Sequence, residues 1–205
     1  MGIIALNGYV LILRGNGILS FLDGISTNVI EGNCTTVFTT SIAKIIDMVE
    51  IIVMGEMVAL VGHGPFKNQI ITHLSKRILG SNITIADASA SNQIMLSTLD
   101  LELDDSVTKI KTFRGWLLVG PKEKCPDVTM TNDEFNQYRV DNILPHQGHE
   151  ITPNVHPLAC GLGHLVHENK GCYIGQEILA RMRSRGRQGK RLIRIENPAE
   201  DATTI

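Results

Sequence analysis

Two apolar segments separated by a tight turn limit most strongly what this chain can fold into. The run KIIDMVEIIV at residues 44–53 is rich in β-branched residues, and Gly55-Glu56 leads from it into MVALVG at 57–62. Apolar, β-branched runs that are bounded by turn residues are typical of β-hairpins. The sequence therefore predicts an antiparallel strand pair in this region.

The segments around this hairpin add helices and further strands. Residues 9–14 have the composition of a strand, and residues 18–22 carry apolar side chains on one face of a short helix. Pro65 opens a stretch with apolar residues at helical spacing that ends at Gly80, and NITIA at 82–86 follows as a strand. Strand, strand, helix and strand in this order indicate a compact α+β unit.

A second and weaker series of the same kind follows. QIMLSTLDLEL at 93–103 and the segment 116–119 are predicted strands, and Thr131-x-x-Glu134 is a capping box that should begin a helix ending before Pro145. The two series predict antiparallel sheets with helices, arranged as two closely packed lobes. We expect one domain over residues 1–195, with a ferredoxin-like unit within about 44–143 and a tail at 196–205.

Composition excludes several classes of protein. Hydrophobic residues make up 43% and charged residues 20% of the 205 positions, which is ordinary for a globular protein. No apolar run approaches the roughly 20 residues needed to cross a bilayer as a helix. The opening residues have strand rather than signal-peptide character, and no C-x-x-C pair occurs. We therefore expect a cytoplasmic protein with reduced thiols. The four cysteines are Cys34, Cys125, Cys160 and Cys172.

Basic charge is concentrated near the C-terminal end. The segment 170–194 holds eight of the nineteen Lys and Arg residues and one acid, Glu177. This imbalance favours an anionic ligand or partner, although a solvated helix face with Arg stems over apolar surface explains it equally well. A helix is predicted over 175–184, and Gly186 fits the left-handed position after its last turn. Cys172 comes just before its N-terminus and two residues after Lys170, and both features stabilise a thiolate. A reactive thiol and a buried structural cysteine both remain open on these grounds.

The motif KGCYIGQE at 170–177, followed by Ala180-Arg181 and Arg185-Gly186, resembles the signature of the YgfZ family. These folate-binding proteins are linked to iron–sulfur cluster maintenance and are related to the aminomethyltransferase (T-protein) of the glycine cleavage system. FLDGISTN at 21–28 is similar to an early motif of the same superfamily, and Arg139-Val140-Asp141 resembles its "R-[IV]-E" element. The resemblance implies an α+β fold like the aminomethyltransferase folate-binding domain.

The same resemblance implies a ligand and its contacts. Tetrahydrofolate or a related reduced pterin is the expected cofactor, with Asp141 hydrogen-bonding its amino-pyrimidine edge. Asp47 resembles the acid of the "G-x-[IL]-x-D" stretch in the aminomethyltransferase and would face the reactive nitrogen, whereas a solvent-facing Asp47 on an edge strand is the plain alternative. Cys172 would be the functional thiol. The remaining expected pterin contacts are Asn28, Lys170, Tyr173, Gln176, Glu177 and Arg181, the last of these (or Arg185) receiving the glutamate tail.

The end of the chain departs from the family pattern. Relatives continue into a C-terminal β-barrel, and we expect this protein to lack that barrel; residues 191–195 resemble one of its strands. Either the barrel is dispensable or a second subunit closes the pocket in a homo-oligomer.

Three functions are compatible with these features of the sequence. The leading hypothesis is a YgfZ-like pterin-binding protein that assists iron–sulfur cluster assembly or repair, with iron–sulfur proteins or their assembly factors as partners. The alternative is a folate-dependent aminomethyltransferase. Nucleic-acid binding is disfavoured by an aromatic content of 4%. The pairs His146-x-x-His149 and His164-x-x-His167 lack further ligands at defined spacing, so no metal site is predicted.

Overall fold

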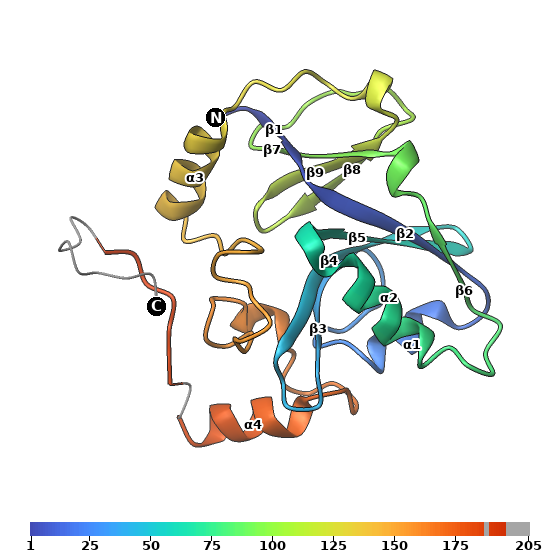
Figure 1. Ribbon diagram of the computed structural model, residues 1–205, viewed down its shortest axis with the longest axis vertical. Coiled ribbons are helices and arrows are strands. Elements are labelled where there is room, and N and C mark those ends of the chain that lie inside the picture. Colours follow the sequence, from blue (N-terminus) through green and yellow to red (C-terminus); the bar gives the residue numbers. More distant parts are fainter. Residues whose placement is uncertain (187–188, 196–205) are drawn as a thin grey trace.

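Two antiparallel sheets that pack against each other form the centre of the molecule (Figure 1). The computed structural model describes residues 1–186 and 189–195. The five-stranded sheet has the order β3-β4-β5-β2-β6, and the four-stranded sheet has the order β1-β7-β9-β8. The strands of the first sheet are β2 (Gly8–Arg14), β3 (Cys34–Thr39), β4 (Ile45–Met54), β5 (Met57–His63) and β6 (Thr84–Asp87). Those of the second sheet are β1 (Ile3–Leu6), β7 (Gln93–Ser97), β8 (Thr108–Thr112) and β9 (Gly115–Gly120).

Two of the four α-helices cover the outer face of the five-stranded sheet. The four α-helices are α1 (Ile18–Asp23), α2 (Lys67–Ser75), α3 (Asn132–Asp141) and α4 (Gln176–Ser184). Short 3-10 turns lie at η1 (Gly64–Phe66), η2 (Ser89–Ser91), η3 (Lys122–Lys124) and η4 (Gly163–Leu165). The α+β class and the antiparallel pairing that were predicted from the sequence are confirmed. Residues 44–143 contribute strands to both sheets, and the ferredoxin-like unit proposed within them stays a prediction.

The predicted hairpin is present as β4 and β5, with Ile51 opposite Leu60 and Gly55 at φ 62° in the turn. Alternate residues of a strand point to opposite faces of the sheet. Ile51 and Leu60 therefore share a core with α1 and α2, while Ile52 and Ala59 on the other face pack against the four-stranded sheet. The hairpin is stable because both of its faces are buried.

Helix α2 is shorter than the sequence predicted. The apolar spacing extended to Leu79, but the helix ends at Ser75 and the chain continues through turns. Leu79 is 83% exposed, so no core contact holds a further helical turn there. The strand predicted at 93–103 likewise ends at Ser97, whose hydroxyl exchanges hydrogen bonds with the backbone of Leu99 and turns the chain away.

Two predictions at helix ends are confirmed. The Thr131 hydroxyl accepts from the backbone N–H of Glu134 at 3.2 Å, and the Glu134 carboxylate accepts from the backbone N–H of Thr131 at 2.8 Å, which is a complete capping box. Gly186 follows α4 in the left-handed region with φ 59°.

The strand predicted at 191–195 is wrong: these residues pair with no other strand in the described chain. They instead run beside α3, where Arg194 forms an ion pair with Asp141 at 3.3 Å and side-chain contacts replace a backbone ladder. The predicted tail, 196–205, lies outside the described residues. Within the described part of the chain, no helix combines the length and hydropathy needed to span a bilayer.

Candidate functional site

Strand β4 places Asp47 in the interior of the molecule. Its side chain is 0% exposed, and β4 lies between β3 and β5, so the interpretation of Asp47 as solvent-facing on an edge strand is wrong. The Tyr9 hydroxyl donates to Oδ2 at 2.6 Å, and the Met48 backbone N–H donates to Oδ1 at 2.8 Å. Burial raises the pKa of Asp47 to about 7, against the opposing effect of these hydrogen bonds. Asp47 is thus an acid that changes protonation near neutral pH.

A second buried acid, Glu50, lies three residues further along β4 and therefore on the opposite face. It is paired with Arg114 from the β8–β9 turn, whose Nη2 lies 3.2 Å from Glu50 Oε1 and which is 4% exposed. The Thr35 hydroxyl also donates to the Glu50 carboxylate. Burial raises the pKa of Glu50, and the positive charge of Arg114 opposes that effect. This pair joins the two sheets through charge as well as through packing.

Gln147 connects the two acids. Its Oε1 accepts from Arg114 Nη1 at 3.2 Å, while its Nε2 donates to the Met48 carbonyl at 3.1 Å and reaches Asp47 Oδ1 at 3.4 Å. The loop that carries Gln147 is attached to α3, because the Glu150 carboxylate accepts a hydrogen bond from the Arg139 guanidinium at 2.9 Å. We call the group Asp47, Glu50, His63, Arg114 and Gln147 the buried polar junction.

The buried polar junction contains groups whose hydrogen-bonding capacity is not used. Arg114 Nη2 lies 2.9 Å from His63 Nε2, and burial lowers the pKa of His63 so that its ring is neutral and accepts this bond. Two nitrogens of the junction, His63 Nδ1 and Arg114 Nε, have no hydrogen-bond partner among the described residues. The same holds for Nδ1 of His146, whose ring centroid lies 6.5 Å from that of His63. Buried polar atoms normally have partners, so these three nitrogens are free to hydrogen-bond with a water molecule or a ligand group.

The KGCYIGQE segment is tied to the FLDGISTN segment by Lys170. The Lys170 side chain is 2% exposed, and its Nζ donates to the carbonyls of Asp23 (2.7 Å), Ser26 (3.0 Å) and Asn28 (2.6 Å) and to the Asp23 carboxylate (3.0 Å). Asn28 in turn donates through Nδ2 to the Thr35 carbonyl at 2.9 Å. The structure therefore brings the two motifs together, and the Lys170 charge is directed at these oxygens rather than at Cys172.

Cys172 is exposed, whereas Cys34 and Cys125 are half-buried and Cys160 is buried. Burial raises the pKa of Cys34 to about 11 and of Cys160 to about 12. Helix α4 begins at Gln176, so Cys172 precedes even the N-cap residue Gly175 by three positions. Cys172 is thus an exposed thiol, but it precedes the helix and lies outside its first turn.

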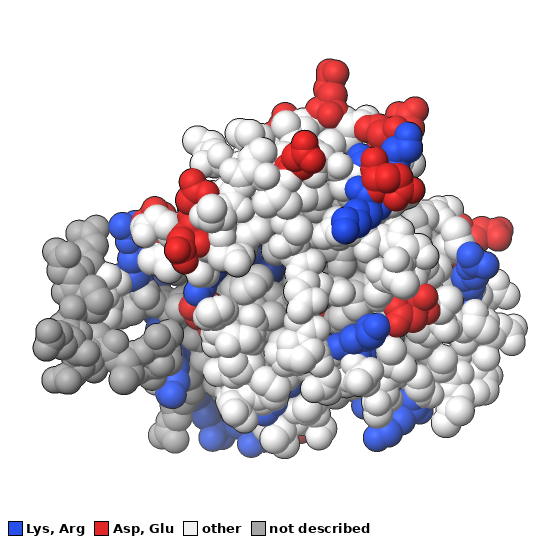
Figure 2. Space-filling view, turned by 45° about the horizontal axis from the view of Figure 1, so that its top comes forward, with Lys and Arg blue, Asp and Glu red and all other residues white. Residues whose placement is uncertain are grey.

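The neighbouring motif residues shape this loop. Tyr173 is buried beneath Lys170, whose Nζ lies 5.4 Å from the ring centroid. The Gln176 amide bridges the Tyr173 N–H and the Lys170 carbonyl, each at 3.4 Å. Glu177 and Arg181 form an exposed ion pair at 2.5 Å on α4. Figure 2 shows basic side chains along the lower edge of the molecule, the side on which Figure 1 places α4, and acidic ones mainly above.

The predicted site residues are not all assembled in one place. Asp141, at the end of α3, is half-exposed and accepts from Gln137 at 2.9 Å and from Arg194. The hydrogen-bond partners of Asp47 and of Asp141 have no residue in common. That these two acids and Cys172 act on one ligand therefore stays a prediction. No cluster of three or more His, Cys, Asp or Glu residues suited to a metal ion occurs in the described ranges. Sequence reasoning missed Tyr9, Arg114 and Gln147, because nothing local distinguishes a buried Arg or Gln from a surface one.

The two sheets, their covering helices and the interior acid on β4 define an α+β protein with the aminomethyltransferase-like fold. Among solved structures, the crystal structure of glycine cleavage system aminomethyltransferase T from Bartonella henselae is similar, with a TM-score of 0.72 and 14% sequence identity. The match covers 90% of this chain and 63% of that one, so this chain spans less than two thirds of the similar enzyme. No family model matches the chain. No curated protein matches it either.

Proposed function

We propose that this protein binds tetrahydrofolate or a related reduced pterin at the buried polar junction, and that its Cys172 thiol serves in iron–sulfur cluster assembly or repair. The observation that carries the proposal is Asp47: a fully buried carboxyl whose pKa is about 7, in the interior of an aminomethyltransferase-like fold. Strongly perturbed acids of this kind are enriched at functional sites. A carboxyl that holds or releases a proton near neutrality suits contact with a pterin nitrogen.

The surroundings of Asp47 support a pterin-like ligand. Gln147 presents a carboxamide that donates toward the Met48 carbonyl and Asp47 and accepts from Arg114. The amide edge of a pterin offers the same combination of donors and an acceptor. A pterin that displaces Gln147 would inherit these partners and meet the unpartnered nitrogens of Arg114 and His63. In this proposal the loop that carries Gln147 opens when the ligand binds.

Cys172 supports the second half of the proposal. A cluster usually needs four thiolates, so a single exposed cysteine fits redox or sulfur chemistry rather than permanent cluster ligation. Lys170, Asn28, Tyr173 and Gln176 hold the Cys172 loop in place through the contacts described above. In this proposal these four residues affect pterin binding by positioning that loop. Iron–sulfur proteins or their assembly factors would be the partners of the thiol.

Other proposed contacts lie on the surface. The Arg181 guanidinium, in an exposed pair with Glu177, suits the carboxylates of a glutamate tail. Asp141 is proposed to contact the amino-pyrimidine edge, which requires release of its Arg194 partner.

Calorimetric titration with tetrahydrofolate under anaerobic conditions tests the binding proposal. We expect saturable heat for the wild-type protein, at least tenfold weaker binding for Asp47→Asn because a charge-assisted hydrogen bond is lost, and unchanged binding for Glu56→Gln. Glu56 is an exposed acid in the β4–β5 turn and is the matched control. Absence of heat and of a thermal shift for the wild type at millimolar ligand would refute the proposal.

Aminomethyl transfer is the second candidate, and it would use the same buried carboxyl, since an acid with a pKa of about 7 can give or take a proton during the transfer. Turnover with an aminomethyl-carrying lipoyl protein, lost in Asp47→Asn and retained in Cys172→Ala, would establish this candidate. Iron–sulfur enzyme activity in cells that is lost with Cys172→Ala and retained with Asp47→Asn would establish the maintenance function.

A further inference from the structure

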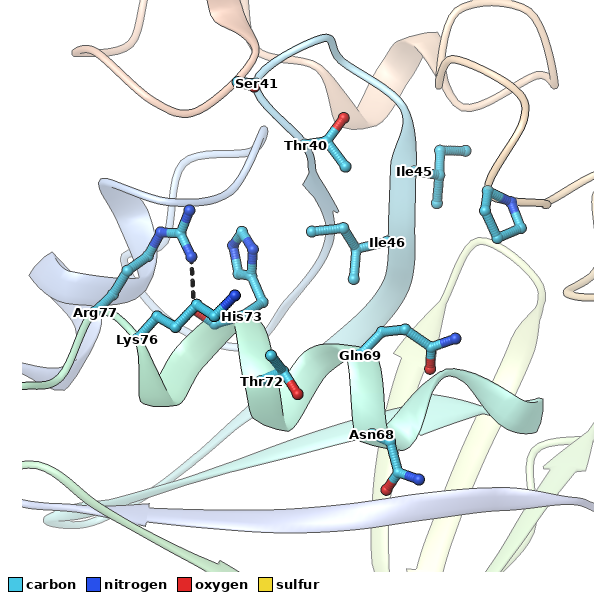
Figure 3. A pocket seen from close by; sticks show the side chains of 11 residues that line it. Thr40, Ser41, Ile45, Ile46, Asn68, Gln69, Thr72, His73, Lys76 and Arg77 are labelled. Carbon is cyan, nitrogen blue, oxygen red and sulfur yellow. Dashed lines mark hydrogen bonds between the residues drawn. The ribbon is translucent and has the colours of Figure 1, made fainter.

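A cavity of about 640 Å³ lies between α2 and the loop that joins β3 to β4 (Figure 3). One wall is formed by four side chains of α2 and the two residues that follow the helix. The other wall is formed by Thr40, Ser41, Ile45, Ile46 and Pro153. This volume is in the range of small-molecule sites. None of the residues of the buried polar junction lines the cavity, so it is a separate site.

The walls combine an apolar surface with positive charge. Ile45, Ile46 and Pro153 form the apolar side, and Lys76 and Arg77 stand at the opposite end in Figure 3. No Asp or Glu is among the lining residues, and neither cation forms an ion pair with a described acid. Cations after the last turn of a helix also stabilise its dipole, which explains their charge but not the apolar surface that they face.

A buried histidine between these two parts has an unused hydrogen-bonding atom. His73 lines the cavity, is 7% exposed and packs edge-on against Phe38 with ring centroids 5.7 Å apart. Its Nε2 is buried and has no partner among the described residues. Burial, with a contribution from Arg77, lowers the pKa of His73 to about 4, so the ring is neutral at physiological pH. A neutral ring with a free nitrogen can accept or donate one hydrogen bond to a ligand.

Arg77 is partly committed to the protein. Its Nη1 donates to the His73 carbonyl at 2.7 Å, which fixes the guanidinium beside the histidine and leaves other N–H groups for a ligand (Figure 3). A guanidinium held in this way offers the planar fork that matches an oxyanion.

We propose that this cavity binds a small organic anion: a molecule with one carboxylate or phosphate group on an apolar body. The oxyanion contacts Lys76 and Arg77, the apolar body covers Ile45, Ile46 and Pro153, and His73 supplies a neutral hydrogen bond between them. This inference is independent of the proposed pterin function, because the two sites share no residue.

Two-dimensional NMR of the backbone-assigned protein tests the inference with four probes. Phenyl phosphate and benzoate carry both parts of the ligand, inorganic phosphate carries the charge alone, and phenol carries the ring alone. We expect saturable shifts around α2 and residues 40–46 for phenyl phosphate, benzoate or both, and the stronger of the two identifies the oxyanion. Equal affinity for inorganic phosphate or for phenol, or shifts located elsewhere, would overturn the proposal.

Three variants sharpen the experiment. Lys76→Gln with Arg77→Gln should weaken binding of the better probe roughly tenfold or more, because two charged donors are removed. Lys67→Gln removes one positive charge from α2 outside the cavity, where Lys67 pairs with Asp87 at 2.7 Å, and should leave the affinity unchanged. Thr72→Trp, at an exposed position lining the cavity, should block binding without disturbing the core. Retained binding in Thr72→Trp, or equal loss in Lys67→Gln, contradicts the assigned site.

Discussion

Asp47→Asn should change how the stability of this protein depends on pH. The ordinary pKa of an aspartic acid is 3.8, and burial raises that of Asp47 to about 7 in the folded protein. The unfolded chain therefore loses this proton near pH 4, while the folded protein keeps it until about pH 7. Between these values the folded state binds the extra proton, so rising pH destabilises the wild-type fold.

The size of this effect follows from the shift of the pKa. Because the pKa of Asp47 is higher by about three in the folded protein, the fold loses about 4 kcal/mol of unfolding free energy, and this loss is complete only above pH 7. Integrated between pH 5 and pH 8, the expected loss of unfolding free energy from Asp47 is about 3 kcal/mol. The Asn variant has the same shape and keeps an acceptor for the Met48 N–H, but it does not titrate.

Urea unfolding of both proteins between pH 5 and pH 8 measures this difference. The stability of Asp47→Asn relative to wild type should rise by about 3 kcal/mol across that range, while other titrating groups cancel in the comparison. Glu56→Gln should show a constant difference from wild type. A constant difference for Asp47→Asn as well would show that Asp47 does not hold a proton near neutrality, and the reasoning on its role would fail with it.

The other predictions concern three separate contacts. Arg114→Met should lower the free energy of unfolding by about 3–5 kcal/mol because it leaves the Glu50 charge buried and unpaired, and adding Glu50→Gln should recover part of this loss in urea unfolding. Gly175→Ala should destabilise the protein by about 1–3 kcal/mol, seen as a lower thermal midpoint, because φ is 85° and a Cβ there would lie 2.7 Å from a neighbouring hydroxyl oxygen. Iodoacetamide should label Cys172 well before Cys160 in the folded protein, as judged by peptide mass spectrometry; equal rates would contradict their difference in burial.

Local patterns predicted the elements whose stability depends on neighbours in the sequence. The β4–β5 hairpin, the Thr131 capping box and the glycine after α4 each rest on contacts within a few residues, and all three are present. Predictions failed where burial decides an element boundary. Helix α2 ends before Leu79, which is exposed, and residues 191–195 pair with no strand among the described residues.

The α+β class and the turns of this protein were determined by its sequence alone, because hydrophobic period and capping chemistry act over short separations. The tertiary structure decided what the polar residues do. Asp47 meets Gln147, and Glu50 meets Arg114, across 100 and 64 positions of the chain. Lys170 reaches back 142 positions to Asn28 and so turns away from Cys172. Whether a charge is buried, and with which partner, depends on these distant contacts, and the burial that tertiary packing imposes raises the pKa of Asp47.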